Sequence, residues 1–444
     1  MAVDVSVRSA RHDSLLRRAD NALPGGVPGF TRLPDDVRFV AREGRGSKVY
    51  DVDGREYIDY LLGSGPLVLG HAHPAVVEAV KRQVERGATF FSLTEPTIEL
   101  AELVCQSAPC AELVRFVGSG SEAITFALRV ARAFTGRDKV MKFEGGYHGV
   151  GDYAQYSLSP HGAATAPEAA AETPGIPRAL DSQMVIAPFN DVETAQRLIA
   201  EHAAELSSVL VEPLQRCIKP APGFLERVAE TARQHDVLVV FDEVVTGYRL
   251  AWGGAQEYYG APCDLAVYGK ALSGGYNTSA IAGRRDVMSL CDPRGVAEGR
   301  FAIVSGTHAG NPIGTAAGVA TLNELRRPGV FERLHATGNR LRAEIMEAGR
   351  RLGVPLQTPG EGPAFMPIIG EHDPADLREL WRNDLKATYQ FGIEMVREGA
   401  LMTPGLKMYL STQHDDDDID RTIVIAERAL RTIKETLAGK GRDA

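Results

Sequence analysis

The sequence predicts an α/β protein whose large domain is built on a mainly parallel, seven-stranded sheet, with a smaller α/β domain at the C-terminus. Between about residues 74 and 310, short uninterrupted apolar runs alternate with longer amphipathic segments, as in parallel sheets covered by helices on both faces. After residue 310 helical periodicity dominates. The chain has 444 residues, of which 44% are hydrophobic and 24% charged, a globular composition in a chain long enough for two or three domains.

We expect three regions along the chain. Residues 1–70 form an N-terminal extension with a hairpin, residues 71–315 the large domain, and residues 316–444 the small domain. The hairpin is expected over residues 47–60, where two alternating runs flank Asp53-Gly54, a dipeptide suited to the positive φ of a tight turn. The small domain is expected from the helical patterns at residues 330–349, 374–399 and 419–437.

Seven apolar runs are the candidate strands of the large sheet. They cover residues 113–117, 140–143, 183–186, 208–211, 237–241, 265–267 and 280–282, and helical segments at residues 122–134, 192–206 and 223–235 lie between them. In parallel α/β sheets ligands bind outside the carboxyl ends of the strands. Reactive side chains that directly follow these runs are therefore the candidates for a functional site.

Two of these runs are followed by side chains that can take part in catalysis. Asp242 and Glu243 follow the run at residues 237–241, and Lys270 follows the run at residues 265–267. The acids lie at the ligand-binding edge, although helix capping would also explain them. Lysine forms Schiff bases once a desolvated setting lowers its pKa, although an isolated lysine at this place is often a solvated surface residue.

The run at residues 113–117 is followed by the small-residue loop GSGSEA at residues 118–123, which opens a helix. The free N–H groups of a helix N-terminus bind phosphate. The loop also matches the G-x-G-x-x-A dinucleotide pattern, with Glu144 near the position of a ribose-binding acid. An NAD-dependent oxidoreductase is therefore an alternative, but it leaves Asp242 and Lys270 unexplained.

Further candidates follow the runs at residues 140–143 and 208–211. Tyr147 and His148 lie between glycines, where an aromatic side chain can stack on a flat ring, and Glu212 and Gln215 add a carboxylate and an amide. A phosphate-binding loop, a stacking aromatic side chain, an acid and a lysine together meet the needs of pyridoxal 5′-phosphate (PLP).

The sequence resembles the class III PLP-dependent aminotransferases, and among them the glutamate-1-semialdehyde 2,1-aminomutase branch, over about residues 20–430. The motifs that carry the resemblance are PGGV at residues 24–27, GPLVLGHAHP at 65–74, KFEGGYHG at 142–149, FDEVVTGYR at 241–249 and GTHAGNP at 306–312. The resemblance implies the type I fold of PLP-dependent transferases, a PLP cofactor and transaminase activity.

The resemblance also implies roles for individual residues. Lys270 would hold the cofactor as a Schiff base and move the substrate proton, and Asp242 would pair with the pyridine nitrogen. Thr307 would reach the phosphate bound by the neighbouring subunit of a homodimer with shared sites. The remaining implied contacts are Gly120 and Ser121 to the phosphate, Tyr147 and His148 to the ring, Glu212 and Gln215 near its hydroxyl, and Arg32 and Ser64 to the substrate.

The positions expected to face the substrate depart from the aminomutase pattern, whereas the residues expected to contact the cofactor match it. PGFT at residues 28–31 replaces Asn-Ser-Pro-Val, Ser64 replaces a tryptophan, Leu406 replaces an acid, and YN at residues 276–277 replaces Leu-Pro. We therefore predict an aminotransferase that moves an amino group from an amino-acid or amine donor to a keto acid, ketone or aldehyde by ping-pong aldimine and pyridoxamine chemistry. A 2,1-aminomutase or PLP epimerase is the alternative, and Lys270 and Asp242 argue against a non-catalytic binding protein.

Composition excludes several other classes. The net charge of −9 argues against nucleic acid or anionic membranes as partners, and no apolar run approaches the ~18–20 residues of a membrane span. Five scattered cysteines without a C-x-x-C pair argue against a disulfide framework or a zinc site and favour the cytoplasm. The acids at residues 415–418 are expected to cap the last helix rather than bind metal, so no metal is expected.

Overall fold

The computed structural model describes residues 8–159 and 166–440. The described residues form two compact units. The first unit joins the N-terminal residues up to His73 with Glu332–Asp373 and with the residues from Glu379 onwards, and the second comprises Pro74–Phe331 and Pro374–Arg378.

The second unit contains the predicted sheet, and the predicted fold class is confirmed. Its strands follow the order β4-β10-β9-β8-β7-β5-β6, and all neighbours are parallel except those of β10, which is antiparallel to β4 and β9. The strands are β4 (Leu113–Val117), β5 (Lys139–Phe143), β6 (Met184–Ala187), β7 (Leu206–Val211), β8 (Leu238–Asp242), β9 (Leu265–Tyr268) and β10 (Ser279–Gly283).

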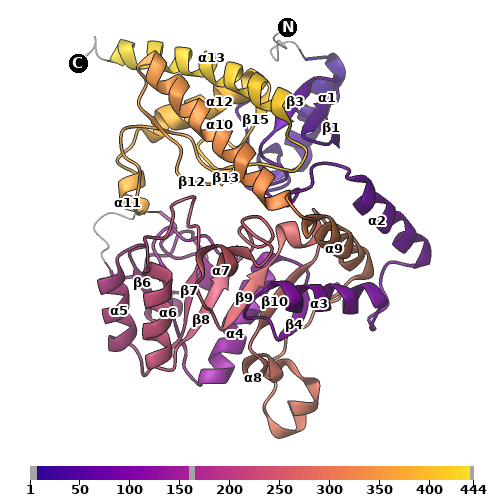
Figure 1. Cartoon of the computed structure of the whole chain (residues 1–444), viewed down its shortest axis with the longest axis vertical. Helices are drawn as coiled ribbons and strands as arrows, with labels where there is room; N and C mark the ends of the chain where they lie inside the picture. Colours follow the sequence, from indigo (N-terminus) through magenta and orange to yellow (C-terminus); the bar gives the residue numbers. More distant parts are fainter. Residues whose placement is uncertain (1–7, 160–165, 441–444) are drawn as a thin grey trace. The chain divides into compact units, whose positions relative to one another are not determined.

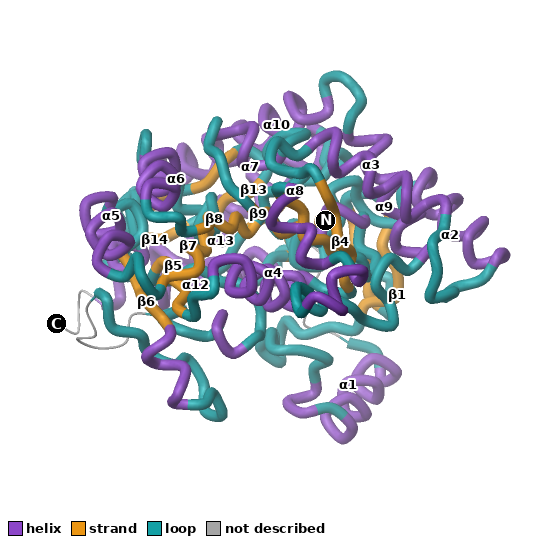
Figure 2. The backbone as a smooth tube through the Cα atoms, turned by 90° about the horizontal axis from the view of Figure 1, so that it is seen from below, coloured by secondary structure: helices purple, strands orange, loops and turns teal. Residues whose placement is uncertain are grey.

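Helices cover this sheet on both faces. Helix α4 (Gly120–Thr135) packs against β4, β7, β8, β9 and β10, whereas α5 (Val192–Glu201) packs against β6 and α6 (Phe224–Gln234) against β8. Figure 2 shows the strands as a layer with α4 on one side and α5 and α6 on the other. The other helices of this unit are α2 (Pro74–Arg86), α3 (Glu95–Ser107), α7 (Gly254–Tyr259), α8 (Arg285–Met288) and α9 (Pro312–Leu325).

The first unit is built around a four-stranded sheet in the order β1-β2-β3-β15. Strands β2 (Lys48–Asp51) and β3 (Glu56–Asp59) form the predicted antiparallel hairpin, and β1 (Ala41–Arg45) pairs with β2. Helix α12 packs against α13 (Figure 1). The remaining elements are α1 (Ala10–Ala22), α12 (Leu385–Arg397), α13 (Asp416–Lys440), β11 (Leu356–Gln357), β12 (Gly360–Glu361), β13 (Ala364–Phe365), β14 (Ile368–Ile369), β15 (Ala400–Leu401) and β16 (Met408–Tyr409). Two helices are divided between the units: α10 (Val330–Leu352) begins in the second unit and continues in the first, and α11 (Leu377–Leu380) likewise begins in the second unit.

Both ends of the chain contribute to this sheet. The register pairs Ile58 of β3 with Ala400 of β15 in parallel. Residues from the ranges 1–70 and 316–444, which the sequence analysis separated, therefore share one unit, because the outer edge of the hairpin obtains its backbone hydrogen bonds from β15.

One predicted helix is interrupted. The pattern at residues 374–399 predicts a continuous helix, but the structure has α11 and α12 with a break between them. The break follows from local hydrogen bonding, because the Asp384 carboxylate accepts the Ala387 N–H at 2.8 Å and so starts α12 as its N-cap. The predicted capping of the last helix is confirmed, since Asp415 accepts the Asp418 N–H at 2.9 Å.

No helix within the described part of the chain combines the length and the apolar composition that crossing a bilayer requires.

Candidate active site

The carboxyl ends of neighbouring strands in the second unit bring the predicted site residues together. Asp242 is the last residue of β8, and Lys270 lies two residues beyond the end of β9. Strands β8 and β9 are parallel neighbours in which Asp242 pairs with Val267. Asp242 and Lys270 therefore lie at the same end of adjacent strands, as the sequence predicts.

The Asp242 carboxylate is buried and held from two sides. His148 Nδ1 lies 2.8 Å from Asp242 Oδ2, and the Val244 N–H donates to Asp242 Oδ1 at 3.1 Å. Because a carboxylate only accepts hydrogen bonds, the His148 proton is on Nδ1. The carboxylate of Asp242 is therefore fixed in orientation by a buried imidazole.

Two buried polar atoms close to Gly146 are unsatisfied. His148 Nε2 and Gln215 Oε1 have no hydrogen-bond partner among the described residues, while Gln215 Nε2 donates to the Glu144 carbonyl oxygen at 2.7 Å. A Cβ at Gly146 would lie 2.8 Å from His148 Nε2 and 3.0 Å from Gln215 Oε1. Because buried polar atoms are normally satisfied, this arrangement fits a polar ligand that completes the hydrogen bonding.

Glu212 connects this region to the predicted stacking residue. It is buried directly after β7, and its carboxylate accepts the Tyr147 N–H at 3.2 Å. The Tyr147 side chain itself is 47% exposed. The backbone of Tyr147 is thus anchored while its ring remains accessible to a flat partner.

The loop after β4 meets the loop after β5. The Ser121 hydroxyl accepts the Val150 N–H at 3.2 Å, and a Cβ at Gly149 would collide with this same hydroxyl. Gly120 packs so closely that a Cβ there would lie 3.1 Å from Val244. The start of α4, whose free N–H groups suit a phosphate, is therefore joined to the segment that carries Tyr147 and His148.

Lys270 has an unusual backbone conformation. It begins a short 3-10 helix, Lys270–Ser273, with a φ of 44°, in the left-handed region that a side chain makes unfavourable. The preceding Gly269 packs closely, since a Cβ there would lie 2.9 Å from Ser279 Oγ. Such strain is kept where surrounding structure enforces it, which is typical of functional positions.

Three other predicted residues belong to other segments of the chain. Thr307 is exposed in the segment before α9. Arg32 and Ser64 belong to the first unit, where Arg32 donates to the Gly25 carbonyl oxygen at 3.0 Å and to Asp35 Oδ1 at 2.7 Å. Ser64 lies in a turn with a φ of 72°. Their predicted roles toward phosphate and substrate stay predictions.

Sequence reasoning missed two cations beside the site. Lys142 is fully buried on β5, and its ammonium donates to the Tyr156 carbonyl oxygen at 2.5 Å and to that of Ala154 at 3.5 Å. Arg216 Nε donates to the Gly145 carbonyl oxygen at 2.8 Å. Both cations hold backbone on either side of the Tyr147 segment. A lysine inside an apolar strand run was the available signal.

Burial, assisted by the nearby Arg216 guanidinium, lowers the pKa of Lys142 to about 7. A free lysine has a pKa of about 10.4. Between these two values the unfolded chain binds a proton that the folded protein has released, so the contribution of Lys142 to stability rises with pH in this range.

Lys142→Met is therefore expected to reduce the rise in unfolding free energy between pH 7 and 9, by up to about 1.4 kcal/mol per pH unit. Urea unfolding at several pH values measures this slope. Lys139→Met is the matched control, because Lys139 lies on the same strand but is partly exposed and paired with Glu205. Equal slopes in wild type and Lys142→Met would contradict the assignment.

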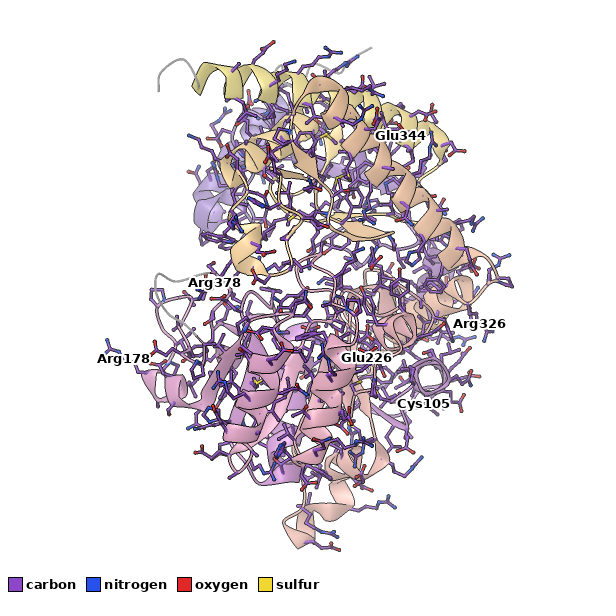
Figure 3. The ribbon with its side chains drawn as sticks, turned by 60° about the vertical axis from the view of Figure 1, so that its left-hand side comes forward. Cys105, Arg178, Glu226, Arg326, Glu344 and Arg378 are labelled. Atoms are coloured by element: carbon purple, nitrogen blue, oxygen red, sulfur yellow. The ribbon has the colours of Figure 1, made fainter. Side chains whose placement is uncertain are left out.

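Glu144 is engaged by an arginine rather than free for a ribose. Arg378 Nε and Nη2 lie 2.9 and 3.0 Å from its two carboxylate oxygens, a bidentate pair. Figure 3 labels Arg378, the last residue of the segment Pro374–Arg378 that belongs to the second unit. The acid that the NAD alternative requires is thus already paired.

Comparisons with known proteins place the chain in a family. The family model for class III aminotransferases matches residues 32–378. The glutamate-1-semialdehyde 2,1-aminomutase of Methanothermobacter thermautotrophicus is 39% identical over 429 residues, which cover 96% of this chain and 100% of that protein. The chain belongs to the class III aminotransferases, as the sequence resemblance implied, and this finding overturns the oxidoreductase alternative.

Solved structures agree with this assignment. An omega-transaminase from Sphaerobacter thermophilus has a TM-score of 0.89 and 34% identity, with 96% of this chain and 98% of that chain covered. A transaminase with PLP bound has a TM-score of 0.87 and 29% identity, with 97% and 99% covered. The protein is an enzyme of this PLP-dependent family, and its cofactor is pyridoxal 5′-phosphate.

The residues present fit this cofactor. The unsatisfied Gln215 Oε1 can accept a hydrogen bond from a ring hydroxyl, the oriented Asp242 carboxylate can accept one from a ring nitrogen, and the start of α4 offers free N–H groups.

Proposed function

We propose that the protein is an aminotransferase, which takes an amino group from an amino-acid or amine donor and passes it to a keto acid, ketone or aldehyde in a ping-pong reaction. The observation that carries the proposal is the placement of Lys270 and the His148-held Asp242 at the same end of adjacent strands.

Each cofactor-facing residue has one task in this proposal. When bound, PLP supplies an electron sink for the carbon that loses a proton. Asp242, oriented by His148, would hold the proton on the ring nitrogen. Gln215 and Glu212 would face the ring hydroxyl, and Tyr147 would cover the ring.

Lys270 would have two tasks. Its Nζ would hold the cofactor covalently at rest, and, once displaced by the donor amine, it would carry the proton between the substrate carbon and the cofactor. Its backbone, held at positive φ behind Gly269, limits the directions in which the side chain can reach. The N–H groups of Gly120 and Ser121 would hold the phosphate at the start of α4.

A 2,1-aminomutase or epimerase is the second candidate, because the relative at 39% identity is a glutamate-1-semialdehyde 2,1-aminomutase. Against it stand the substrate-facing departures, above all Ser64 and Leu406 in place of a tryptophan and an acid. Arg32 would suit a substrate carboxylate in either case.

We expect the holoenzyme to convert one equivalent of a suitable amino donor per site and then stop until a carbonyl acceptor is added. The reason is that intermolecular transfer leaves the amino group on the cofactor after the first half-reaction. A panel of donors, followed by the absorbance of the aminated cofactor, measures this. Continuous turnover of glutamate 1-semialdehyde with no second substrate would contradict the transferase and establish the aminomutase.

We also propose a homodimer in the cytoplasm. Several large apolar side chains are exposed in the single chain, among them Phe91 and Leu93 at 82% and 80% and Ile303 at 59%, which favours an interface. In this dimer Thr307 would reach the phosphate of the neighbouring site. All five cysteines are free thiols, which fits a reducing compartment.

A further inference from the structure

Side chains of one loop hold the turn at residues 144–147, which carries the ring of Tyr147. This loop directly follows β7. Gln215 Nε2 donates to the first carbonyl oxygen of the turn at 2.7 Å, and Arg216 Nε donates to the second at 2.8 Å. Glu212 Oε2 accepts the Tyr147 N–H at 3.2 Å. The position of the turn therefore depends on three side chains of the same loop.

Arg216 also reaches a second segment of the chain. Its Nη2 donates to the Leu158 carbonyl oxygen at 3.3 Å, and the two segments are joined by the Gly145 N–H, which donates to the Ser157 carbonyl oxygen at 2.7 Å. Gly145 and Leu158 are both buried. One guanidinium thus bridges two buried stretches of backbone, and its removal would take a charged donor away from both carbonyl oxygens.

The backbone of Arg216 is held in an unfavourable conformation. The Ile218 N–H donates to the Gln215 carbonyl oxygen at 2.7 Å and closes a tight turn. The two central residues, Arg216 and Cys217, have φ angles of 53° and 66°. Two positive φ angles are typical of a type I′ turn, which favours Asn-Gly at these positions. An arginine that is kept in such a conformation indicates that its side chain has a task there.

We propose that Arg216 is a positioning residue for the cofactor, whose guanidinium keeps the Tyr147 ring in place by holding the Gly145 carbonyl oxygen. Gly145 lies two residues before Tyr147, so a shift of its peptide group also moves the aromatic ring. The proposal rests on the role that we propose for Tyr147 in covering the cofactor ring. It does not require that the amino group passes to a second substrate.

The test compares the Arg216→Asn and Arg216→Lys holoenzymes with wild type. Asparagine accepts a positive φ, so the tight turn is kept while the guanidinium is lost. We expect Arg216→Asn to release the cofactor about 10-fold faster on dilution, the scale of a lost charged hydrogen bond. The circular dichroism of the bound cofactor should change as well. Lysine can donate to one of the two carbonyl oxygens, so Arg216→Lys should recover part of both properties.

Release and dichroism like those of wild type in Arg216→Asn would overturn the proposal. If this variant does not fold, Arg216→Gly takes its place, because glycine also adopts a positive φ without strain. Both readouts concern the bound cofactor rather than amino transfer. A negative result here is therefore distinguishable from failure of the aminotransferase assignment, which the donor panel tests.

Arg137 provides the matched control, because it is partly exposed like Arg216 and also binds backbone. Its Nη1 donates to the carbonyl oxygens of His235 and Asp236 at 3.1 and 2.9 Å. These residues precede β8 and so lie at the end of the sheet opposite to Asp242. We expect Arg137→Asn to lower the free energy of unfolding and to keep the wild-type release rate. Equal acceleration in Arg137→Asn and Arg216→Asn would mean a general loss of stability and refute the positioning role.

A double variant tests whether Arg216 acts through Tyr147. Tyr147→Ala is expected to speed cofactor release by itself. Adding Arg216→Asn should then have little further effect, because the ring that the guanidinium positions is gone. If the two effects multiply in full, Arg216 acts by another route and the proposal is wrong.

Discussion

Lys270→Ala is expected to lower the rate of amino transfer by at least about 10²–10⁴-fold, the range associated with losing a general acid–base group. Alanine has no amine to hold the cofactor covalently or to carry the substrate proton. The purified variant should also lack the absorption band of the lysine-linked cofactor. Steady-state transfer rates and the absorption spectrum measure both effects.

A matched lysine distinguishes this role from a general effect of removing charge. Lys139→Ala changes a lysine at the start of β5 that is paired with Glu205, and it is expected to keep both spectrum and rate. Added small alkylamines should restore part of the activity of Lys270→Ala, because a free amine can carry the proton. Wild-type turnover in Lys270→Ala would eliminate the proposed mechanism.

Asp242→Asn is expected to have the second largest effect, a loss of about 10²–10⁴-fold in kcat. An amide of the same shape can still accept the hydrogen bond from His148 Nδ1 but carries no charge to keep the ring nitrogen protonated. The folded structure should therefore persist while the electron sink weakens. Single-turnover rates with a good donor, at saturating cofactor, measure the loss.

Glu243→Gln is the control for this experiment, because Glu243 is the adjacent acid and is also buried. Its carboxylate accepts the backbone N–H groups of Ala255 and Gln256 at the start of α7 rather than facing His148. We expect Glu243→Gln to change the free energy of unfolding while leaving the single-turnover rate near that of wild type. The reverse pattern would show that the wrong acid has been assigned.

The strands of the large sheet were predictable because each buried strand is a run of consecutive apolar residues, which can be recognised in the sequence. The run at residues 113–117 coincides with β4, and the other strands differ from their predicted ranges by one or two residues. The rule that ligands bind at strand ends then located Asp242 and Glu212. It left open which of the two acids at residues 242 and 243 faces the site, since both follow the same strand.

Other features required the folded chain. Lys142 and Arg216 act through backbone carbonyl oxygens of residues distant in sequence, and such contacts leave no periodic pattern. The break before α12 was hidden because an aspartate that caps a helix can equally lie on its polar face.

The parallel pairing of β3 with β15 has a consequence for biosynthesis. Ile58 finds its partner, Ala400, about 340 residues later in the chain. At about 5–20 residues per second, a ribosome takes roughly 20–70 s to produce the intervening segment. During that interval the hairpin has an open edge able to pair with other chains, so its protection while the polypeptide emerges becomes a requirement for a good yield of active enzyme.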